Sequence, residues 1–313
     1  MKVVKNIITV IAVFMIIAGI VCLSIGVNNG GKIFFGIDYA NKKIVYPNDD
    51  IIEKTYDYDD FKNLEINVDC MKLTIKEGKE YKVACKYMDD FKPEIDLSGD
   101  TLKITQRLKD KSVTDFGRFL SVSKNGISFG SNILGNSVEI TIPKGEKLDN
   151  IKINAKAGDV NLNSFEADEI KADLKAGDLK VSDINVDNME FTLNAGDVKI
   201  DEIEGKDFNI KINAGDVNLT HGKFDSVKID MDAGDLDIDK TDADDFDIKL
   251  SSGDVDASFP GKEKDYNVDV KCSAGDLSVD GDDDHGNDYT SDNDADKDIV
   301  IKCSFGDIDV DFD

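Results

Sequence analysis

The sequence predicts an all-β protein, a short parallel β-solenoid made of a single stack of coils with about 19 residues per coil. Three observations predict this fold class. Apolar residues alternate with period two, Val, Ile and Asp dominate the alternating segments, and Gly-Asp pairs recur every 19 residues, with glycines at 158, 177, 196, 215, 234 and 253. A fixed repeat of this size indicates stacked repeats, and a period of two indicates strands rather than helices.

Each repeat places apolar residues on both sides of its Gly-Asp corner. In the first copy, Ile153 and Ala155 precede the corner and Val160 follows it. Ala155 and Val160 are five residues apart, so an unbroken strand would direct their side chains to opposite faces. Gly tolerates positive φ and lets the chain turn there. We therefore predict a coil of strand, corner, second strand and polar return, in which Ile153, Ala172 and Phe191 are neighbours in successive coils about 4.8 Å apart.

A β-sandwich is the alternative fold, but it does not require a constant 19-residue register. We expect residues 151–313 to form the regular solenoid, including two later copies at Gly275 and Gly306. The acidic run 280–298 is expected to be a solvated insertion between coils. Residues 61–150 are expected to form irregular β coils or a cap, with a first imperfect repeat copy at Gly99-Asp100 and an inserted loop or hairpin at 109–136.

The amino-terminal region predicts a membrane anchor. Residues 7–27 contain no charged side chain, and Lys2 and Lys5 precede them in a short tail, residues 1–6. About 20 apolar residues are enough to cross a bilayer. A cleaved signal peptide and a lipoprotein signal ending at Cys22 are the alternatives, but neither has a suitable small-residue cleavage site. We expect a single-pass transmembrane helix in the cell membrane, a juxtamembrane linker at 28–60, and the bulk of the chain outside the cytoplasm.

The charge of the chain excludes one class of function. There are 65 acidic and 38 basic residues, which gives a net charge of −27. Nucleic acid is therefore not an expected partner, because its phosphates would be repelled. The chain has no Trp and two His, His221 in a return loop and His285 in the acidic run. No nucleophile stands beside either in a recognisable motif, so we expect no enzyme and no catalytic residues.

The Asp residues that follow the repeated glycines form a column along the predicted stack. One interpretation is structural, with each carboxylate accepting a backbone N–H at its turn. The other is a line of weak Ca²⁺ sites, since hard cations prefer oxygen ligands. The glycine-rich pattern of calcium-binding solenoids is absent, so we expect no firm metal site and no cofactor. The candidates for Ca²⁺ are Asp159, Asp178, Asp197, Asp216, Asp235 and Asp254.

Residues 109–136 supply the best candidate binding surface, because loops on rigid scaffolds commonly carry function. They contain Phe116, Arg118, Phe119 and Phe129 in an otherwise acidic molecule. The alternative is that these aromatic side chains cover the open end of the solenoid.

Four cysteines follow the apolar segment. Cys272 and Cys303 occupy equivalent positions in their repeats, and Cys70 and Cys85 lie at analogous ends of strands expected to be adjacent. Stacked coils bring equivalent Cα atoms to a separation that a disulfide accepts. A Cys272–Cys303 disulfide and a pair of buried free thiols are both open.

The segment "VEITIPKGEKLDNIKINAKAGDVNL", followed by serial "AGDV", "AGDL" and "SGDV" copies, resembles bacterial β-strand-repeat proteins labelled "putative adhesins", which include the LiaG- and YvlB-like envelope proteins. The resemblance covers about Phe61 to the carboxyl end. It implies a membrane-associated envelope protein, often linked to envelope stress responses, and it brings no catalytic residues. We expect a membrane-anchored binding or scaffold protein with an envelope protein as partner. A surface adhesin for a matrix or glycan, and an enzyme acting on polysaccharide, are the alternatives.

Overall fold

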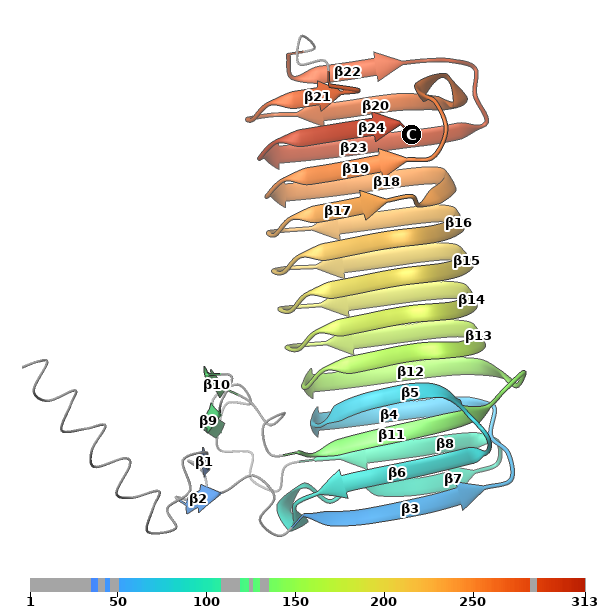
Figure 1. Cartoon of the computed structure of the whole chain (residues 1–313), viewed down its shortest axis with the longest axis vertical. Coiled ribbons are helices and arrows are strands. Elements are labelled where there is room, and N and C mark those ends of the chain that lie inside the picture. The colour runs from blue at the N-terminus through green and yellow to red at the C-terminus, as the bar shows by residue number, and fades with distance from the viewer. Residues whose placement is uncertain are drawn as a thin grey trace, which may run out of the picture.

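A computed structural model describes residues 35–38, 43–45, 51–107, 119–123, 126–129, 135–281 and 286–312. The regular elements in these ranges are strands, apart from two short 3-10 turns, η1 (Asp89–Phe91) and η3 (Glu263–Asp265). Most of the strands form one continuous sheet that winds into a long stack (Figure 1). The chain is therefore an all-β solenoid, as the sequence predicts.

The middle of the stack consists of parallel coils in constant register. Its strands are β12 (Lys147–Ala157), β13 (Val160–Leu174), β14 (Leu179–Leu193), β15 (Val198–Ile212), β16 (Val217–Met231), β17 (Leu236–Asp239), β18 (Asp242–Ser252) and β19 (Val255–Phe259). Ile153 pairs with Ala172, and Ala172 pairs with Phe191. Residues 19 apart are thus neighbours in adjacent coils, which confirms the predicted stacking.

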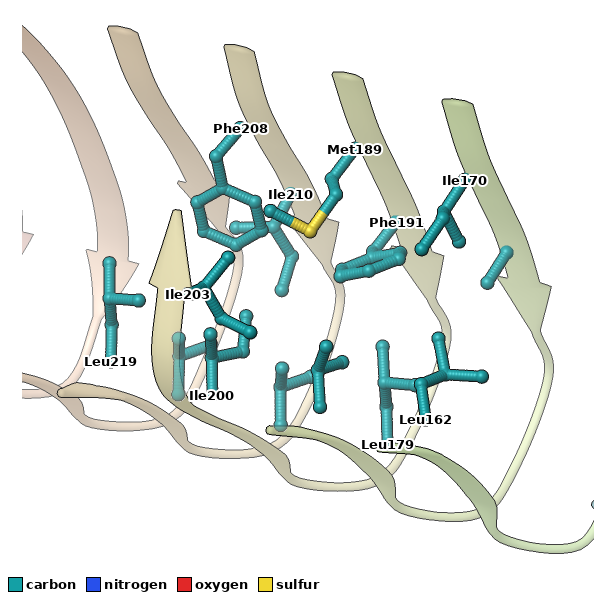
Figure 2. Packing of buried hydrophobic residues seen from close by; sticks show 14 of the residues in the cluster. Leu162, Ile170, Leu179, Met189, Phe191, Ile200, Ile203, Phe208, Ile210 and Leu219 are labelled. Carbon is teal, nitrogen blue, oxygen red and sulfur yellow. The ribbon is translucent and has the colours of Figure 1, made fainter. Parts of the chain in front are cut away.

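Each long strand bends twice, so a coil has three sides rather than two. In β13, the backbone pairing with β14 is interrupted at Ser164 and Asp168. Ser164 has a φ of 55°, in the left-handed region. The expected polar return is therefore wrong, because it is a third paired side that buries Phe165 and Ala167. In the next coils this side buries Ile184, Val186 and Ile203. Figure 2 shows Ile203 in the interior of its coil, between Phe208 and Ile200.

Phe224 is one of two phenylalanines on the third side, with Phe165, and two glycines lie against its ring. Its ring stacks on Phe208 with 5.5 Å between centroids. A Cβ atom on Gly222 would lie 2.6 Å from the Phe224 ring, and one on Gly205 would lie 2.5 Å from the carbonyl oxygen of Val186. In the preceding coils the residues paired with Gly222 and Gly205 are Ile203 and Val186, so each glycine leaves volume that the Phe224 ring occupies.

The amino-terminal end of the stack combines parallel coils with antiparallel covering strands. β4 (Asn63–Cys70) and β5 (Lys72–Gly78) form a coil that pairs with β12 and β13. Below them lie β6 (Tyr81–Tyr87), β8 (Thr101–Gln106) and β11 (Ser137–Pro143). The outermost strands are β3 (Ile52–Tyr58), antiparallel to β6, and β7 (Glu94–Ser98), antiparallel to β8.

Two expectations for this end need correction. Residues 52–58 belong to the solenoid as β3, although we placed them in the linker 28–60. Gly99 and Asp100 form the turn of the β7–β8 hairpin and are not a repeat corner, since Ser98 pairs with Thr101 across them. A Gly-Asp pair suits both kinds of turn, so the dipeptide alone does not distinguish them.

The carboxyl-terminal coils do not stack in chain order. β23 (Lys297–Phe305) and β24 (Ile308–Phe312) lie between β18–β19 and the earlier coil of β20 (Tyr266–Cys272) and β21 (Leu277–Val279). β22 (Asp288–Ser291) pairs antiparallel with β20 at the end of the stack. The expected solvated insertion 280–298 therefore contains a covering strand and the start of the next coil.

A second sheet has four antiparallel strands, β1 (Phe35–Asp38), β2 (Lys43–Val45), β9 (Phe119–Ser123) and β10 (Gly126–Phe129), described by their backbone alone. The predicted tail 1–6 and transmembrane segment 7–27 lie outside the described residues. Within the described ranges, no helix has the length and apolar character needed to cross a membrane.

Candidate functional site: a groove along the left-handed corners

The Asp column is built into the backbone of the stack. The Asp235 N–H donates to Oδ1 of Asp216 at 3.0 Å, and the Asp254 N–H donates to Oδ1 of Asp235 at 3.0 Å. Equivalent bonds run from the Asp178 N–H on Asp159 to the Asp276 N–H on Asp307. Each carboxylate thus binds the next coil rather than its own turn. Among the described residues, no three His, Cys, Asp or Glu groups converge as a metal site would require.

The predicted binding loop cannot be placed as a surface. Phe116 and Arg118 lie outside the described residues, and Phe119 and Phe129 lie on β9 and β10, whose side chains are not described. The loop as a recognition surface or as a cap stays a prediction.

The structure pairs two of the four cysteines directly. Cys272 lies opposite Cys303 on adjacent strands, and both are buried free thiols. Their Sγ atoms donate to the carbonyl oxygens of Gly306 at 3.1 Å and Gly253 at 3.4 Å. Burial raises the pKa of both thiols.

Cys70 and Cys85 are not neighbours, contrary to our expectation. Cys70 pairs with Ala157 and Cys85 with Val138, because β4 and β6 belong to different sides of the coil. Burial raises the pKa of Cys85 to about 12.

A groove of about 750 Å³ lies on the third side of the coils. It crosses four successive coils and is bounded at one end by the turn between β11 and β12, which projects on the side where the long strands bend (Figure 1). Three columns of residues form it. The first rim has Ser164, Asp183, Glu202 and His221, the floor has Phe165, Ile184 and Ile203, and the second rim has Glu166, Asn185, Glu204 and Lys223.

The first rim exists because each coil turns through one left-handed residue. The φ angles at Ser164, Asp183, Glu202 and His221 lie between 51° and 57°. This conformation is uncommon outside glycine, although Asp and His adopt it more readily than most residues. The turn separates two sides whose apolar positions are three residues apart, as in Leu162 and Phe165. The side chain at each corner therefore points outward and forms the rim.

Hydrogen bonds order part of this rim. The Ser164 hydroxyl donates to Oδ2 of Asp183 at 2.8 Å. His221 Nδ1 lies 3.1 Å from Oδ1 of Asp201, which also accepts the Thr220 hydroxyl at 2.8 Å. The Thr220 hydroxyl, and then His221, lower the pKa of Asp201, so its carboxylate remains ionised near neutral pH. His221 is thus held against the coil at the far end of the groove.

At the near end, Glu146 is similarly fixed. Its Oε2 accepts from Lys62 Nζ at 2.9 Å and from the Tyr81 hydroxyl at 3.2 Å. The hydrogen bond from Lys62, followed by that from Tyr81, lowers the pKa of Glu146. Burial is the main cause that raises the pKa of Tyr81 to about 12, so its hydroxyl stays protonated as a donor.

Three carboxylates in the middle of the groove have no such partners. Glu166, Glu202 and Glu204 are exposed, and no ion pair or hydrogen bond involves their side chains within the described part of the chain. Many surface acids elsewhere pair with lysine, for example Asp187 with Lys206 at 3.1 Å. The groove therefore presents exposed carboxylates, and the apolar side chains beneath them are buried in the core. Glu166 and Glu204 each lie opposite a lysine on a neighbouring strand, Lys147 and Lys223.

The groove was missed at the sequence level, although a signal for it exists. Phe165 and Ala167 repeat as Ile184 and Val186 one period later, offset by three residues from the second strand. This offset marks a second corner. We treated His221 as an isolated loop residue, whereas it is one member of a column.

The fold and the groove together define a β-solenoid protein with a lateral groove across four of its coils. The sequence matches the Toastrack family model, DUF4097, over residues 61–311, and the chain belongs to this family. No curated protein matches the sequence.

Two crystal structures from Parabacteroides distasonis are similar in fold. One is a "putative adhesin" with 12% sequence identity and a TM-score of 0.50, and the match covers 85% of this chain and 98% of that protein. The other is named a "putative lipid binding protein", with 10% identity, a TM-score of 0.41 and the same two coverages.

Proposed function

We propose that the protein is a membrane-anchored rod of the cell envelope that binds an envelope component through its lateral groove. The observation that carries this proposal is the groove itself, which spans four coils and presents the exposed carboxylates of Glu166, Glu202 and Glu204. Solenoids hold such repeated surfaces rigidly, because every coil is hydrogen-bonded to its neighbours. Rigid presentation favours binding, since little order is lost when a ligand arrives.

The anchor and the exterior location follow from the apolar segment 7–27 and from Lys2 and Lys5 before it. The test is labelling of intact cells with a membrane-impermeant maleimide. The full-length Asp232→Cys variant should be labelled, since this position is exposed, and the native buried cysteines should react slowly. Labelling of Asp232→Cys only after lysis would contradict an exterior location.

Binding is tested by co-sedimentation of the full-length protein, in detergent, with isolated envelope polymer. The variant Glu166→Gln/Glu202→Gln/Glu204→Gln should sediment less than the parent. A matched variant, Glu94→Gln/Asp173→Asn/Asp232→Asn, removes the same charge from exposed positions outside the groove and should behave as the parent. Equal loss in both variants, or no sedimentation of the parent, would argue against a groove-based binding role.

A surface adhesin is the second candidate, favoured by the name of the similar Parabacteroides protein. An adhesin binds material from outside the cell, whereas an envelope scaffold or stress-sensor accessory binds a neighbour in its own membrane. Crosslinking in cells distinguishes them. A membrane protein captured by the full-length chain and lost when 109–136 is deleted supports the accessory role with an envelope protein partner.

A further inference from the structure

The second sheet, formed by β1, β2, β9 and β10, divides its residues by polarity between its two faces. Residues paired across antiparallel strands lie on the same face, and consecutive residues along a strand alternate between faces. Two rows across the sheet are entirely apolar: Ile44, Ile37, Leu120 and Phe129 in one, and Phe35, Val122 and Ile127 in the other. The row between them lies on the opposite face and holds Val45, Gly36, Ser121 and Ser128. One face of the sheet is therefore made of apolar residues alone.

This sheet is separate from the solenoid sheet. Within the described ranges its four strands pair only with one another, and Figure 1 shows them beside the stack rather than within it. An apolar sheet face is stable only when a second apolar layer covers it. The place of the sheet in the chain, its size and its charge indicate what that layer is.

The sheet lies close to the predicted membrane anchor. Only residues 28–34 separate the apolar segment 7–27 from β1, and the eight steps from Val27 to Phe35 span at most about 28 Å. Its other two strands belong to an insertion at the amino-terminal end of the stack. β8 pairs with β4 and β11 with β5, so residues 107–136 replace the single corner residue Met71 of the next coil. The sheet thus joins the anchor to the end of the solenoid.

The apolar face is too small for a stable protein interface. Four strands about 4.8 Å apart, each with about four residues at a rise of 3.4 Å, cover roughly 250 Å². Specific protein interfaces bury about 800 Å² on each partner. A lipid surface does not need this area, because the predicted anchor holds the sheet beside the membrane at a high effective concentration.

Charge also favours an anionic lipid surface over a second copy of this chain. Residues 28–45 and 109–136 contain seven basic and three acidic residues, whereas the whole chain contains 38 basic and 65 acidic residues. Basic residues beside a membrane are attracted to anionic lipid headgroups. The acidic solenoid is repelled both by such a surface and by another solenoid.

We propose that the apolar face of the second sheet lies on the membrane surface, in contact with anionic lipid. The apolar rows lie at the boundary between headgroups and acyl chains, and the basic residues of the same segments meet the headgroups. This proposal rests on the membrane anchor of the proposed function and adds a second contact that does not span the bilayer. Two contacts limit the directions that the rod can take relative to the membrane.

The test uses single tryptophan variants, because the chain contains no Trp. Phe129→Trp and Ser128→Trp occupy consecutive positions of β10, on the apolar and the opposite face. Phe305→Trp reports from the solenoid, where Phe305 is 65% exposed. Each full-length variant is reconstituted into vesicles of phosphatidylcholine and phosphatidylglycerol, with or without bromine on the acyl chains. Bromine should quench the emission of Phe129→Trp at least about twofold more than that of Ser128→Trp or Phe305→Trp.

Matched charge variants test the lipid class. In the Phe129→Trp background, Lys42→Gln/Lys43→Gln/Lys124→Gln should lower the quenching by about half, as should omission of phosphatidylglycerol or added salt. Lys228→Gln/Lys264→Gln/Lys302→Gln removes the same charge from exposed solenoid positions and should leave the quenching unchanged. Equal effects of the two triple variants would overturn the contact with anionic lipid.

The remaining outcomes separate this proposal from the anchor. Equal quenching of Phe129→Trp and Ser128→Trp in protein that floats with the vesicles would overturn the proposal and leave the anchored rod intact. Blue-shifted emission of Phe129→Trp without quenching would overturn it too, because protein rather than lipid would then cover the face. Protein that does not float with the vesicles would overturn the anchor and this proposal together.

Discussion

The backbone N–H of Asp307 donates a 2.8 Å hydrogen bond to Oδ1 of Asp254, although 53 residues separate the two in the chain. The Asp276 N–H in turn bonds Oδ1 of Asp307. The Asp column is therefore continuous through the place where chain order and stacking order differ. The column follows the stacking order of the coils rather than their order in the chain. The coil of β23 and β24, which comes last in the chain, is therefore bonded to its neighbours in the same way as the others.

The Asp column should tolerate Asn better than Ala. Asp216→Asn keeps an oxygen that accepts the Asp235 N–H and removes repulsion from neighbouring carboxylates. Asp216→Ala loses the acceptor and should lower the free energy of unfolding by about 1 kcal/mol. Thermal and urea unfolding of both variants measure the difference. An Asn variant as unstable as the Ala variant would show that the negative charge itself is required.

Millimolar Ca²⁺ should leave the unfolding midpoint of the parent unchanged. Oδ1 of Asp216 already accepts a backbone N–H, as do its equivalents along the column, and no three ligand groups converge among the described residues. A ligand bound only by the native state must raise the midpoint. A rise with Ca²⁺ that is absent in Asp216→Asn would establish a calcium site in the column.

The corner glycines should be among the least replaceable residues. A Cβ atom on Gly215 would lie 2.0 Å from the carbonyl oxygen of Gly196, and its φ of 138° is unfavourable for other residues. Gly215→Ala should therefore destabilise the protein by about 3 kcal/mol or more, because the backbone of two coils must separate. Gly145→Ala is the control, since φ there is 79° and no atom lies within 4 Å of the new Cβ. It should cost about 1–2 kcal/mol. Equal losses would place the whole effect in backbone strain rather than in coil contact.

Gly222 and Phe224 should be energetically coupled. Gly222→Ala places a methyl group 2.6 Å from the Phe224 ring and should cost about 1–3 kcal/mol through overpacking. Phe224→Ala alone should cost about 3–5 kcal/mol through its cavity. In the double variant the methyl group no longer meets the ring, so the total loss should be smaller than the sum. Strict additivity in urea unfolding would contradict direct packing between the two positions.

Oxidation should join Cys272 to Cys303. Their cross-strand placement gives a Cα separation that disulfides accept, and 31 residues separate them in the chain. The bond should raise stability by about 3 kcal/mol, which Cys272→Ser should abolish and Cys70→Ser should not. Because burial raises the pKa of both thiols, the reaction should be slow at neutral pH and faster at higher pH. Failure of peptide mapping to detect the crosslink after prolonged mild oxidation would exclude it.

Asp256 should destabilise the protein at neutral pH. Burial, and then the charges of Asp309 and Asp237, raise its pKa in the folded state. A raised carboxyl pKa means that the folded state holds the proton more tightly, so this contribution is present at low pH and is lost as pH rises through the folded pKa. Asp256→Asn should therefore be stabilising by less than about 1 kcal/mol at pH 7. The gain should vanish below about pH 4, near the ordinary Asp pKa. A gain independent of pH would exclude titration of Asp256 as its cause.

The repeat period alone determined which residues are neighbours across the regular coils, as Ile153, Ala172 and Phe191 illustrate. Strands of equal length and pattern pair most favourably in phase, because a shift of one residue would expose every apolar side chain. The Gly-Asp corners were equally predictable, because the odd spacing of the apolar residues on either side requires a turn there. The structure shows why the turn residue is glycine: a Cβ atom would meet the backbone of the neighbouring coil.

Only the tertiary structure decided the order of the last coils and the existence of the groove. The corners at Gly275 and Gly306 are interchangeable in pattern, and β22 on the outer edge of β20 leaves the inner place to β23. The left-handed corners at Ser164, Asp183 and Glu202 share no residue type, so in the sequence only the three-residue offset of the apolar positions on either side marks them. The groove takes three neighbouring positions from each coil, such as Glu202, Ile203 and Glu204, so it forms only when the coils stack.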